Sequence, residues 1–188
     1  MDKAVDRTGA VVIWLTGIPG AGKTTIAKAL HPKLLEAGYR VELLDGDVVR
    51  SQLSPDLGFT KQDRELHGRR VVYLCKLLSR NGIACIVSLI SPYRDLRDFA
   101  RREIGNNFFE VHVQASLETC IKRDPKGLYK KALAGEIKDL TGLQDKYEPP
   151  LNPELTVNTE TESLESIITK IASRLAESNY LKNQSRTH

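Results

Sequence analysis

The chain has 188 residues, a length typical of one domain, and its 28 Lys and Arg residues against 24 Asp and Glu residues give a net charge of +4. With 40% apolar and 28% charged residues, the composition excludes collagen-like, coiled-coil and disordered chains. The longest apolar stretch, residues 83–90, is far shorter than the roughly 20 residues that span a membrane. Residues 1–7 contain two acids and no apolar core of a signal peptide. We therefore expect a cytoplasmic protein without a membrane partner.

The cysteines and the basic residues narrow the class of ligand. Cys75, Cys85 and Cys120 lie in apolar contexts without Cys-x-x-Cys spacing, which favours buried free thiols over disulfides or a zinc site. Lys and Arg are concentrated in residues 61–80 and 122–131. Two basic segments on a nearly neutral chain fit a small, highly anionic ligand better than a nucleic acid, and no nucleic-acid partner is expected.

Strand and helix signals alternate along the chain. The predicted order is strand 11–15, helix 24–37, strand 40–44, helix 60–80, strand 83–89, helix 92–104, strand 108–113, helix 116–123, helix 128–134, strand 155–157 and helix 163–176. This alternation predicts an α/β fold with a parallel sheet, right-handed crossovers and helices on both faces. Such sheets bind ligands beyond the carboxyl ends of their strands.

Local signals mark several boundaries. Ser91 and Pro92 suit the N-cap and the first position of the helix after the third strand, and Ser116 suits the N-cap of the next short helix. Residues 124–153 are rich in Gly, Pro, Lys and Glu and predict a mobile excursion from the sheet. The polar tail from about residue 177 is expected to be frayed.

A glycine-rich turn between the first strand and the first helix matches the phosphate-loop pattern G-x-x-x-x-G-K-[ST]. It reads Gly17-Ile18-Pro19-Gly20-Ala21-Gly22-Lys23-Thr24. Its glycines let backbone N–H groups surround a phosphate, and the helix N-terminus adds its positive end. We expect Lys23 to contact the β and γ phosphates of ATP and the Thr24 hydroxyl to ligate Mg²⁺.

The acidic residues distinguish between classes of phosphate-loop protein. The third strand ends without an Asp, whereas Asp45 and Asp47 follow the second strand. Such a pair can divide its roles, one carboxylate holding a Mg²⁺-bound water or Lys23 and the other facing an acceptor hydroxyl. The alternative is an Asp-Gly turn with a helix N-cap. Because a phosphate loop precedes the pair and no N-K-x-D segment is present, we favour a small-molecule kinase over a GTPase.

Further motifs continue in a characteristic order over about residues 11–159. They are residues 17–25, 45–50 and 56–59, Asp63-Arg64, Arg69-Arg70, residues 90–94, 123–132 and 135–137, Thr141-Gly142, Tyr147-Glu148-x-Pro150 and residues 153–155. In this order they resemble the adenylyl-sulfate (APS) kinases, which make 3′-phosphoadenylyl sulfate. The resemblance implies a single P-loop kinase domain over residues 1–188, a lid at about 124–147, Mg²⁺ and ATP, and a homodimer.

The resemblance also implies a set of site residues. It assigns ATP to residues 17–25, thus including Thr25, and to Arg123. It assigns adenylyl sulfate to Asp47, Arg50, Phe59, Arg64, His67, Ile90, Ser91, Lys126, Asp139 and Leu140. Guanidinium groups suit a sulfate–phosphate anhydride, and Phe59 offers a face for adenine stacking. Asp47 is implied as the proton acceptor, Lys23 as the charge stabiliser and Asp45 as a metal ligand through water.

Three positions carry open alternatives. Ser91 is at the family's phosphoserine position, although a substrate contact or an N-cap fits it equally. His67 replaces a family carboxamide, so either a substrate contact with pH-dependent charge or a structural role is possible. Leu140 replaces a lid Phe that sandwiches adenine, a loss on the order of 1 kcal/mol. On this basis Leu140→Phe is expected to lower the KM for adenylyl sulfate.

Two other functions fit the motifs less completely. One is a related P-loop kinase that phosphorylates a nucleoside monophosphate or another small alcohol. The other is a nucleotide-gated binding module without turnover, against which the intact Lys23, Asp45, Asp47 and Arg50 argue.

Overall fold

The computed structural model describes residues 9–178 and 180. Its strands form one parallel sheet in the order β2-β3-β1-β4-β5. They are β1 (Val12–Thr16), β2 (Val41–Asp45), β3 (Ala84–Ser88), β4 (Phe108–Gln114) and β5 (Leu155–Asn158). The predicted α/β class and parallel sheet are confirmed.

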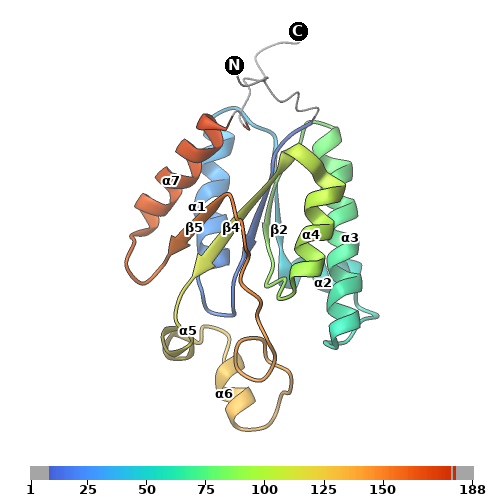
Figure 1. The fold of residues 1–188 in the computed structure, drawn as a ribbon, viewed down its shortest axis with the longest axis vertical. Helices are drawn as coiled ribbons and strands as arrows, with labels where there is room; N and C mark the ends of the chain where they lie inside the picture. The colour runs from blue at the N-terminus through green and yellow to red at the C-terminus, as the bar shows by residue number, and fades with distance from the viewer. Residues whose placement is uncertain (1–8, 179, 181–188) are drawn as a thin grey trace.

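Helices cover both faces of the sheet (Figure 1). They are α1 (Lys23–Glu36), α2 (Gly46–Leu53), α3 (Lys61–Arg80), α4 (Arg94–Ile104), α5 (Leu117–Arg123), α6 (Leu128–Leu133) and α7 (Leu164–Glu177), with a 3-10 turn at Gly105–Asn107. Figure 1 shows α1 and α7 on one face, α3 and α4 on the other, and α5 and α6 beyond the arrowheads of the strands. In residues 9–178 and 180, no helix is long and apolar enough to cross a membrane.

The central strand explains the two-layer packing. Successive side chains of a strand point to opposite faces. Ile13 and Leu15 accordingly belong to the apolar cluster with α1 and α7, and Val12 and Trp14 belong to the cluster with α3 and α4. All four side chains have no exposed surface. A strand buried on both faces favours apolar residues at successive positions, which is why residues 12–15 form a continuous apolar run.

Helix starts show where local signals suffice and where they do not. The expected N-cap is confirmed at Ser116, whose side chain accepts from Thr119 N. Ser163, the expected first residue of the last helix, is the N-cap of α7. The N-cap prediction for Ser91 is wrong: α4 begins two residues after Pro92, and its N-cap is Tyr93 without a side-chain bond. The Ser91 hydroxyl is engaged by Trp14 and Thr16 instead.

Two other expectations need adjustment. The segment after β2, for which no helix was predicted, forms the short helix α2, and its N-cap is Asp45, as one alternative for the acidic turn allowed. The tail expected to fray from residue 177 is partly ordered, because Glu177 belongs to α7. Tyr180 packs edge-on against Phe109, with 5.2 Å between ring centroids, and donates to Phe108 O at 2.9 Å. Residues 181–188 lie outside the described part of the chain.

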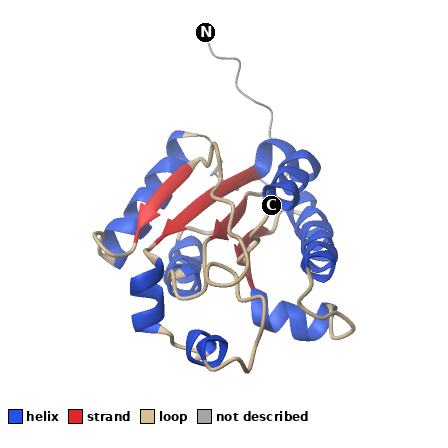
Figure 2. Ribbon diagram, turned by 60° about the horizontal axis from the view of Figure 1, so that its bottom comes forward, coloured by secondary structure: helices blue, strands red, loops and turns tan. Residues whose placement is uncertain are grey.

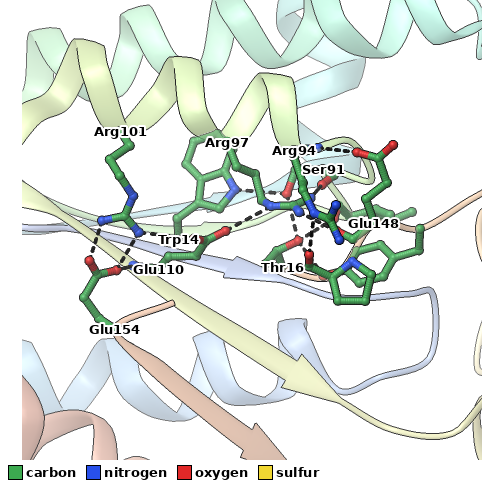
Figure 3. Close-up of polar contacts among 12 residues, drawn as sticks. Trp14, Thr16, Ser91, Arg94, Arg97, Arg101, Glu110, Glu148 and Glu154 are labelled. Atoms are coloured by element: carbon green, nitrogen blue, oxygen red, sulfur yellow. Dashed lines mark hydrogen bonds and ion pairs between the residues drawn. The ribbon is translucent and has the colours of Figure 1, made fainter. Parts of the chain in front are cut away.

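A buried polar network joins α4, β4 and the segment that follows the lid (Figure 3). Arg97 and Glu110 are 2% and 5% exposed, and Arg97 Nε lies 3.0 Å from Glu110 Oε1. The Arg97 guanidinium also donates to the carbonyls of Ser91 and Glu148. Arg101 joins Glu110 at 3.2 Å and Glu154 at 2.9 Å. The network therefore fixes three segments that are distant in sequence.

Substitutions of Arg97 and Glu110 test how much this ion pair contributes to stability. Arg97→Met leaves the Glu110 carboxylate in the interior with only Arg101, so we expect a loss of about 3 kcal/mol in the free energy of unfolding. Arg97→Met/Glu110→Gln removes the orphaned charge as well and should recover at least about 1 kcal/mol of that loss. Urea denaturation measures both values. A double variant as unstable as the sum of its two single variants would contradict the proposed coupling.

Candidate active site

A cavity of about 650 Å³ opens at the carboxyl edge of the sheet, beside β1. The strand order changes direction at β1: β2 and β3 lie on one side of it, and β4 and β5, which follow later in the chain, lie on the other. This is where parallel sheets bind ligands. Figure 2 shows α5, α6 and the loops arching over this edge.

Most of the predicted site residues line this cavity. Those that do are Pro19, Gly20, Gly22, Lys23, Thr24, Thr25, Asp45, Asp47, Arg50, Phe59, Arg64, His67, Ile90, Ser91, Arg123 and Lys126. Those outside its lining are Gly17, Ile18, Ala21, Asp139 and Leu140. The structure therefore brings the nucleotide loop, the acidic turn and the basic residues of α2 and α3 around one space.

The phosphate loop has the tight backbone that its glycines allow. A Cβ added to Gly17 would lie 2.4 Å from Val113 O, and Gly22 has a φ of 101° at the N-cap of α1. Lys23 is 8% exposed, and its Nζ donates to Gly17 O at 2.7 Å and Ile18 O at 2.8 Å. Burial lowers the pKa of Lys23 to about 7. The loop thus holds its cation on backbone carbonyls, ready for a phosphate.

The oxygen atoms next to Thr24 suit a hard divalent cation. Thr24 Oγ1 lies 3.1 Å from Asp45 Oδ2 and 3.2 Å from Ser88 Oγ. Mg²⁺ prefers such oxygen ligands and keeps several waters and substrate phosphates in its shell. No cluster of three or more His, Cys, Asp or Glu side chains suited to a metal is present among the described residues. A site made mainly of phosphate and water oxygens needs none.

Asp45 and Asp47 have separate surroundings. Asp45 Oδ1 accepts from Asp47 N at 3.1 Å, so Asp45 caps α2 while its other oxygen faces Thr24. Asp47 lies in the first turn of α2, and its carboxylate pairs with Lys126 of the lid. The N-cap alternative therefore holds at Asp45, the catalytic and metal-binding roles of the pair stay predictions, and both carboxylates line the cavity.

Arginines and an aromatic ring form the other end of the cavity. The Arg50 guanidinium lies 4.6 Å from the centroid of the Phe59 ring, and that side chain is 65% exposed. Arg64 donates to Phe59 O at 2.7 Å, to Asp139 O at 2.6 Å and to Thr141 Oγ1 at 2.5 Å. An exposed ring beside two guanidinium groups suits a ligand with a flat base and anionic groups.

His67 forms part of the wall behind these arginines. It is 2% exposed, its Nδ1 lies 2.9 Å from Ser54 Oγ, and its Nε2 has no hydrogen-bond partner among the described residues. Burial, together with Arg50 and Arg70, lowers the pKa of His67 to about 4. The imidazole is neutral at pH 7, so the pH-dependent charge considered from the sequence does not arise near neutrality.

Ser91 lines the cavity through a strained turn. Its φ is 41°, it is 3% exposed, and its Oγ accepts from Trp14 Nε1 at 3.0 Å and donates to Thr16 Oγ1 at 3.1 Å. Figure 3 shows the hydroxyl turned toward these two β1 residues. Its proton and a lone pair are therefore both used inside the fold.

The lid packs directly on the phosphate loop. Tyr129, 1% exposed, donates to Pro19 O at 2.9 Å, and a Cβ on Gly142 would lie 2.9 Å from Ile18 Cγ2. Leu140 is 7% exposed and belongs to the apolar cluster over α1 and α7, so it points away from the cavity. Leu140 is therefore outside the lining of the cavity, and the adenine contact expected of it stays a prediction.

Thr159, which the sequence motifs missed, belongs to the nucleotide end of the cavity. Its hydroxyl and its carbonyl accept from Arg123 at the end of α5, at 2.8 Å and 2.9 Å. Thr159 directly follows β5 and lines the cavity. The rule that ligands lie at strand ends was the one available signal, since no short motif contains this residue.

The buried position of Leu140 predicts an effect of Leu140→Phe on stability, whereas the sequence predicted an effect on the KM for adenylyl sulfate. Leu140→Phe adds volume to a packed apolar cluster, and we expect the free energy of unfolding to fall by about 1–3 kcal/mol. Thermal and urea denaturation measure the loss. Leu133→Phe, at an exposed position of α6 (66% exposed), is the control and should be nearly neutral. An unchanged stability together with a lower KM for adenylyl sulfate would restore the adenine contact.

Comparison with known proteins identifies the family. A family model for adenylylsulphate kinase matches residues 9–158. The adenylyl-sulfate kinase of Rippkaea orientalis is 58% identical over 171 residues, which are 91% of this chain and 94% of that protein. An APS kinase from Mycobacterium tuberculosis, solved with AMPPNP and APS, has a TM-score of 0.86 at 37% identity, covering 90% of this chain and 99% of that one.

A hexameric APS kinase from Thiobacillus denitrificans has a TM-score of 0.70 at 31% identity, covering 93% of this chain and 30% of that one. A phosphate loop with an acidic turn is compatible with many small-molecule kinases. These matches, however, extend from the loop through the arginine end and the lid to residue 158. The chain therefore belongs to the adenylyl-sulfate kinases, the family that phosphorylates adenylyl sulfate to 3′-phosphoadenylyl sulfate.

Proposed function

We propose that this chain transfers the γ-phosphoryl group of ATP to the ribose 3′-hydroxyl of adenylyl sulfate, giving 3′-phosphoadenylyl sulfate and ADP. One observation carries the proposal. A single cavity has the phosphate loop at one end and the Arg50–Phe59–Arg64 group at the other. Helix α2 connects the two ends, because its N-cap Asp45 lies beside Thr24 and Arg50 follows within the helix.

The two ends bind different parts of the substrates. Residues 17–25 surround the phosphates of ATP with backbone N–H groups, and Lys23 leaves its two carbonyl partners to contact the β and γ phosphates. Arg50 and Arg64 bind the sulfate–phosphate anhydride of the acceptor through charge-assisted hydrogen bonds. The exposed face of Phe59 stacks on its adenine. Ile90, Lys126 and the neutral His67 complete the acceptor wall.

Direct in-line transfer fits the residues present. The 3′-oxygen forms a bond to the γ-phosphorus while the bond to the β–γ bridging oxygen breaks, and the hydroxyl proton passes to the Asp47 carboxylate. Lys23 stabilises the charge on the transferred group. Thr24, and Asp45 through water, would hold Mg²⁺, which when bound neutralises charge on the phosphates. Closure of residues 124–147 excludes water that would otherwise hydrolyse ATP.

We assign Ser91 a role in shaping the acceptor wall. Its hydroxyl is bonded to Trp14 and Thr16, and its carbonyl accepts from Arg97. In-line transfer needs no covalent intermediate on a serine. The engaged hydroxyl supports a positional role for this residue.

The proposal extends to location and assembly. Cys75, Cys85 and Cys120 are free and buried, which fits the reducing cytoplasm, where ATP is also available. We propose a homodimer, as the family resemblance implies; the hexameric relative shows that larger assemblies occur in the family. Light scattering measures the mass of the particle.

The decisive assay is ADP formation from labelled ATP with a panel of acceptors. We expect activity with adenylyl sulfate, and activity only with a nucleoside monophosphate or another alcohol would overturn the proposed substrate. Asp47→Asn should lower kcat by about 10²–10⁴-fold with nearly unchanged ATP affinity, because the amide cannot accept the proton. Asp95→Asn, at an exposed position of α4, is the control. A near-normal kcat for Asp47→Asn would remove this carboxylate from the chemistry.

The lowered pKa of Lys23 predicts a proton linkage. Burial lowers the pKa of Lys23 to about 7, and a bound phosphate favours the charged form of this lysine. Binding of MgATP at pH 8 should therefore be accompanied by the uptake of about one proton, and at pH 6 by much less. The affinity for MgATP therefore falls as pH rises above 7. Calorimetry in buffers of different ionisation enthalpy measures the uptake, and Lys23→Met should abolish it. Equal uptake in that variant would assign the proton to another group.

A further inference from the structure

Thr159 makes an unusual set of contacts for a residue in a turn. It is half-buried after β5 and lines the nucleotide end of the cavity. Its hydroxyl and its carbonyl each accept one N–H of Arg123, at 2.8 Å and 2.9 Å. Two bonds from one guanidinium to one residue fix the plane of that group as well as its position.

The same residue also holds the phosphate loop. Thr159 Oγ1 donates to Ala21 O at 3.0 Å, and Thr159 N donates to Gln114 O at the end of β4 at 3.0 Å. A Cβ added to Gly22 would lie 3.3 Å from Thr159 Cγ2, so the methyl group packs against the glycine that begins α1. One side chain thus contacts the phosphate loop with its proton and its methyl, and Arg123 with its lone pair.

Apart from Thr159, the exposed Arg123 side chain at the end of the short helix α5 has a long hydrogen bond, from its guanidinium to Gly20 O at 3.4 Å. Ordering such a side chain during binding costs conformational entropy, and a side chain already ordered avoids that cost. The acceptor end of the cavity is built by α2 and α3, so this arrangement concerns the nucleotide end.

We propose that Thr159 is a positioning residue for ATP, whose hydroxyl ties Arg123 to the phosphate loop before the nucleotide arrives. The inference rests on the proposed function in that it takes Arg123 as a contact of ATP. It predicts an effect on ATP affinity that is separate from the affinity for the acceptor.

The test uses two substitutions that separate the hydroxyl from the methyl group. Thr159→Val keeps the shape and loses the hydroxyl, and we expect it to raise both the Kd for MgATP and the KM for ATP about three- to tenfold. The KM for adenylyl sulfate and kcat should stay within about twofold of the parent values. Thr159→Ser keeps the hydroxyl and should restore ATP affinity. Thr169→Val, which removes an exposed hydroxyl bonded only locally to Glu165 O, is the matched control.

The outcomes are distinguishable. Equal effects of Thr159→Val and Thr159→Ser, or equal rises in both KM values, would mean a merely structural role and would overturn the inference. In an Arg123→Ala background the effect of Thr159→Val should largely disappear, and an undiminished effect would refute the link through Arg123. If the parent protein forms no ADP with adenylyl sulfate, the proposed function fails, whereas the calorimetric Kd for MgATP still decides the role of Thr159.

Discussion

The arrangement of the active site depends on one buried charge. Arg97 is 2% exposed, and a guanidinium in that position must have its N–H groups satisfied. Its partners are Glu110 on β4, the carbonyl of Ser91 after β3 and the carbonyl of Glu148 after the lid. Satisfying this one side chain therefore fixes the acceptor wall and the return of the lid relative to the sheet.

The lid, residues 124–147, is held by buried contacts along most of its length, including Leu140 in the apolar core and Thr141, which accepts from Arg64. At its carboxyl end, Tyr147 reaches Thr16 at 3.0 Å and Glu148 N donates to Pro92 O at 2.8 Å. At its amino end, Tyr129 is buried against Pro19. Before Tyr129, Lys126 and Asp47 meet through side chains that are 52% and 72% exposed, an ion pair that water screens and that contributes little. This pair is therefore the weakest link between the lid and the acidic turn, and the buried contacts hold the rest of the lid in place.

Local sequence signals predicted the parts of the site that depend on local geometry. The phosphate loop and the acidic turn lie at strand ends, where a few consecutive residues determine the backbone. The N-cap expected at Ser91 failed because Trp14, 77 residues away, takes the hydroxyl. Leu140 aligns with a ligand position of the family, but in the fold its side chain packs into the apolar cluster of α1 and α7. Thr159 was missed because its partners Arg123 and Ala21 come together only in the folded chain.

Each of the main cations of the cavity rests on oxygen acceptors of the protein. Lys23 rests on the carbonyls of Gly17 and Ile18, Arg64 on those of Phe59 and Asp139, and Lys126 on the Asp47 carboxylate. An anionic substrate replaces these neutral carbonyls with charged oxygens, and charge-assisted bonds are roughly twice as strong as neutral ones. The exchange favours anions over neutral ligands of the same shape. Because Lys126 pairs with Asp47, an anion that draws Lys126 away also frees the Asp47 carboxylate, which is the step that the proposed proton transfer to Asp47 requires.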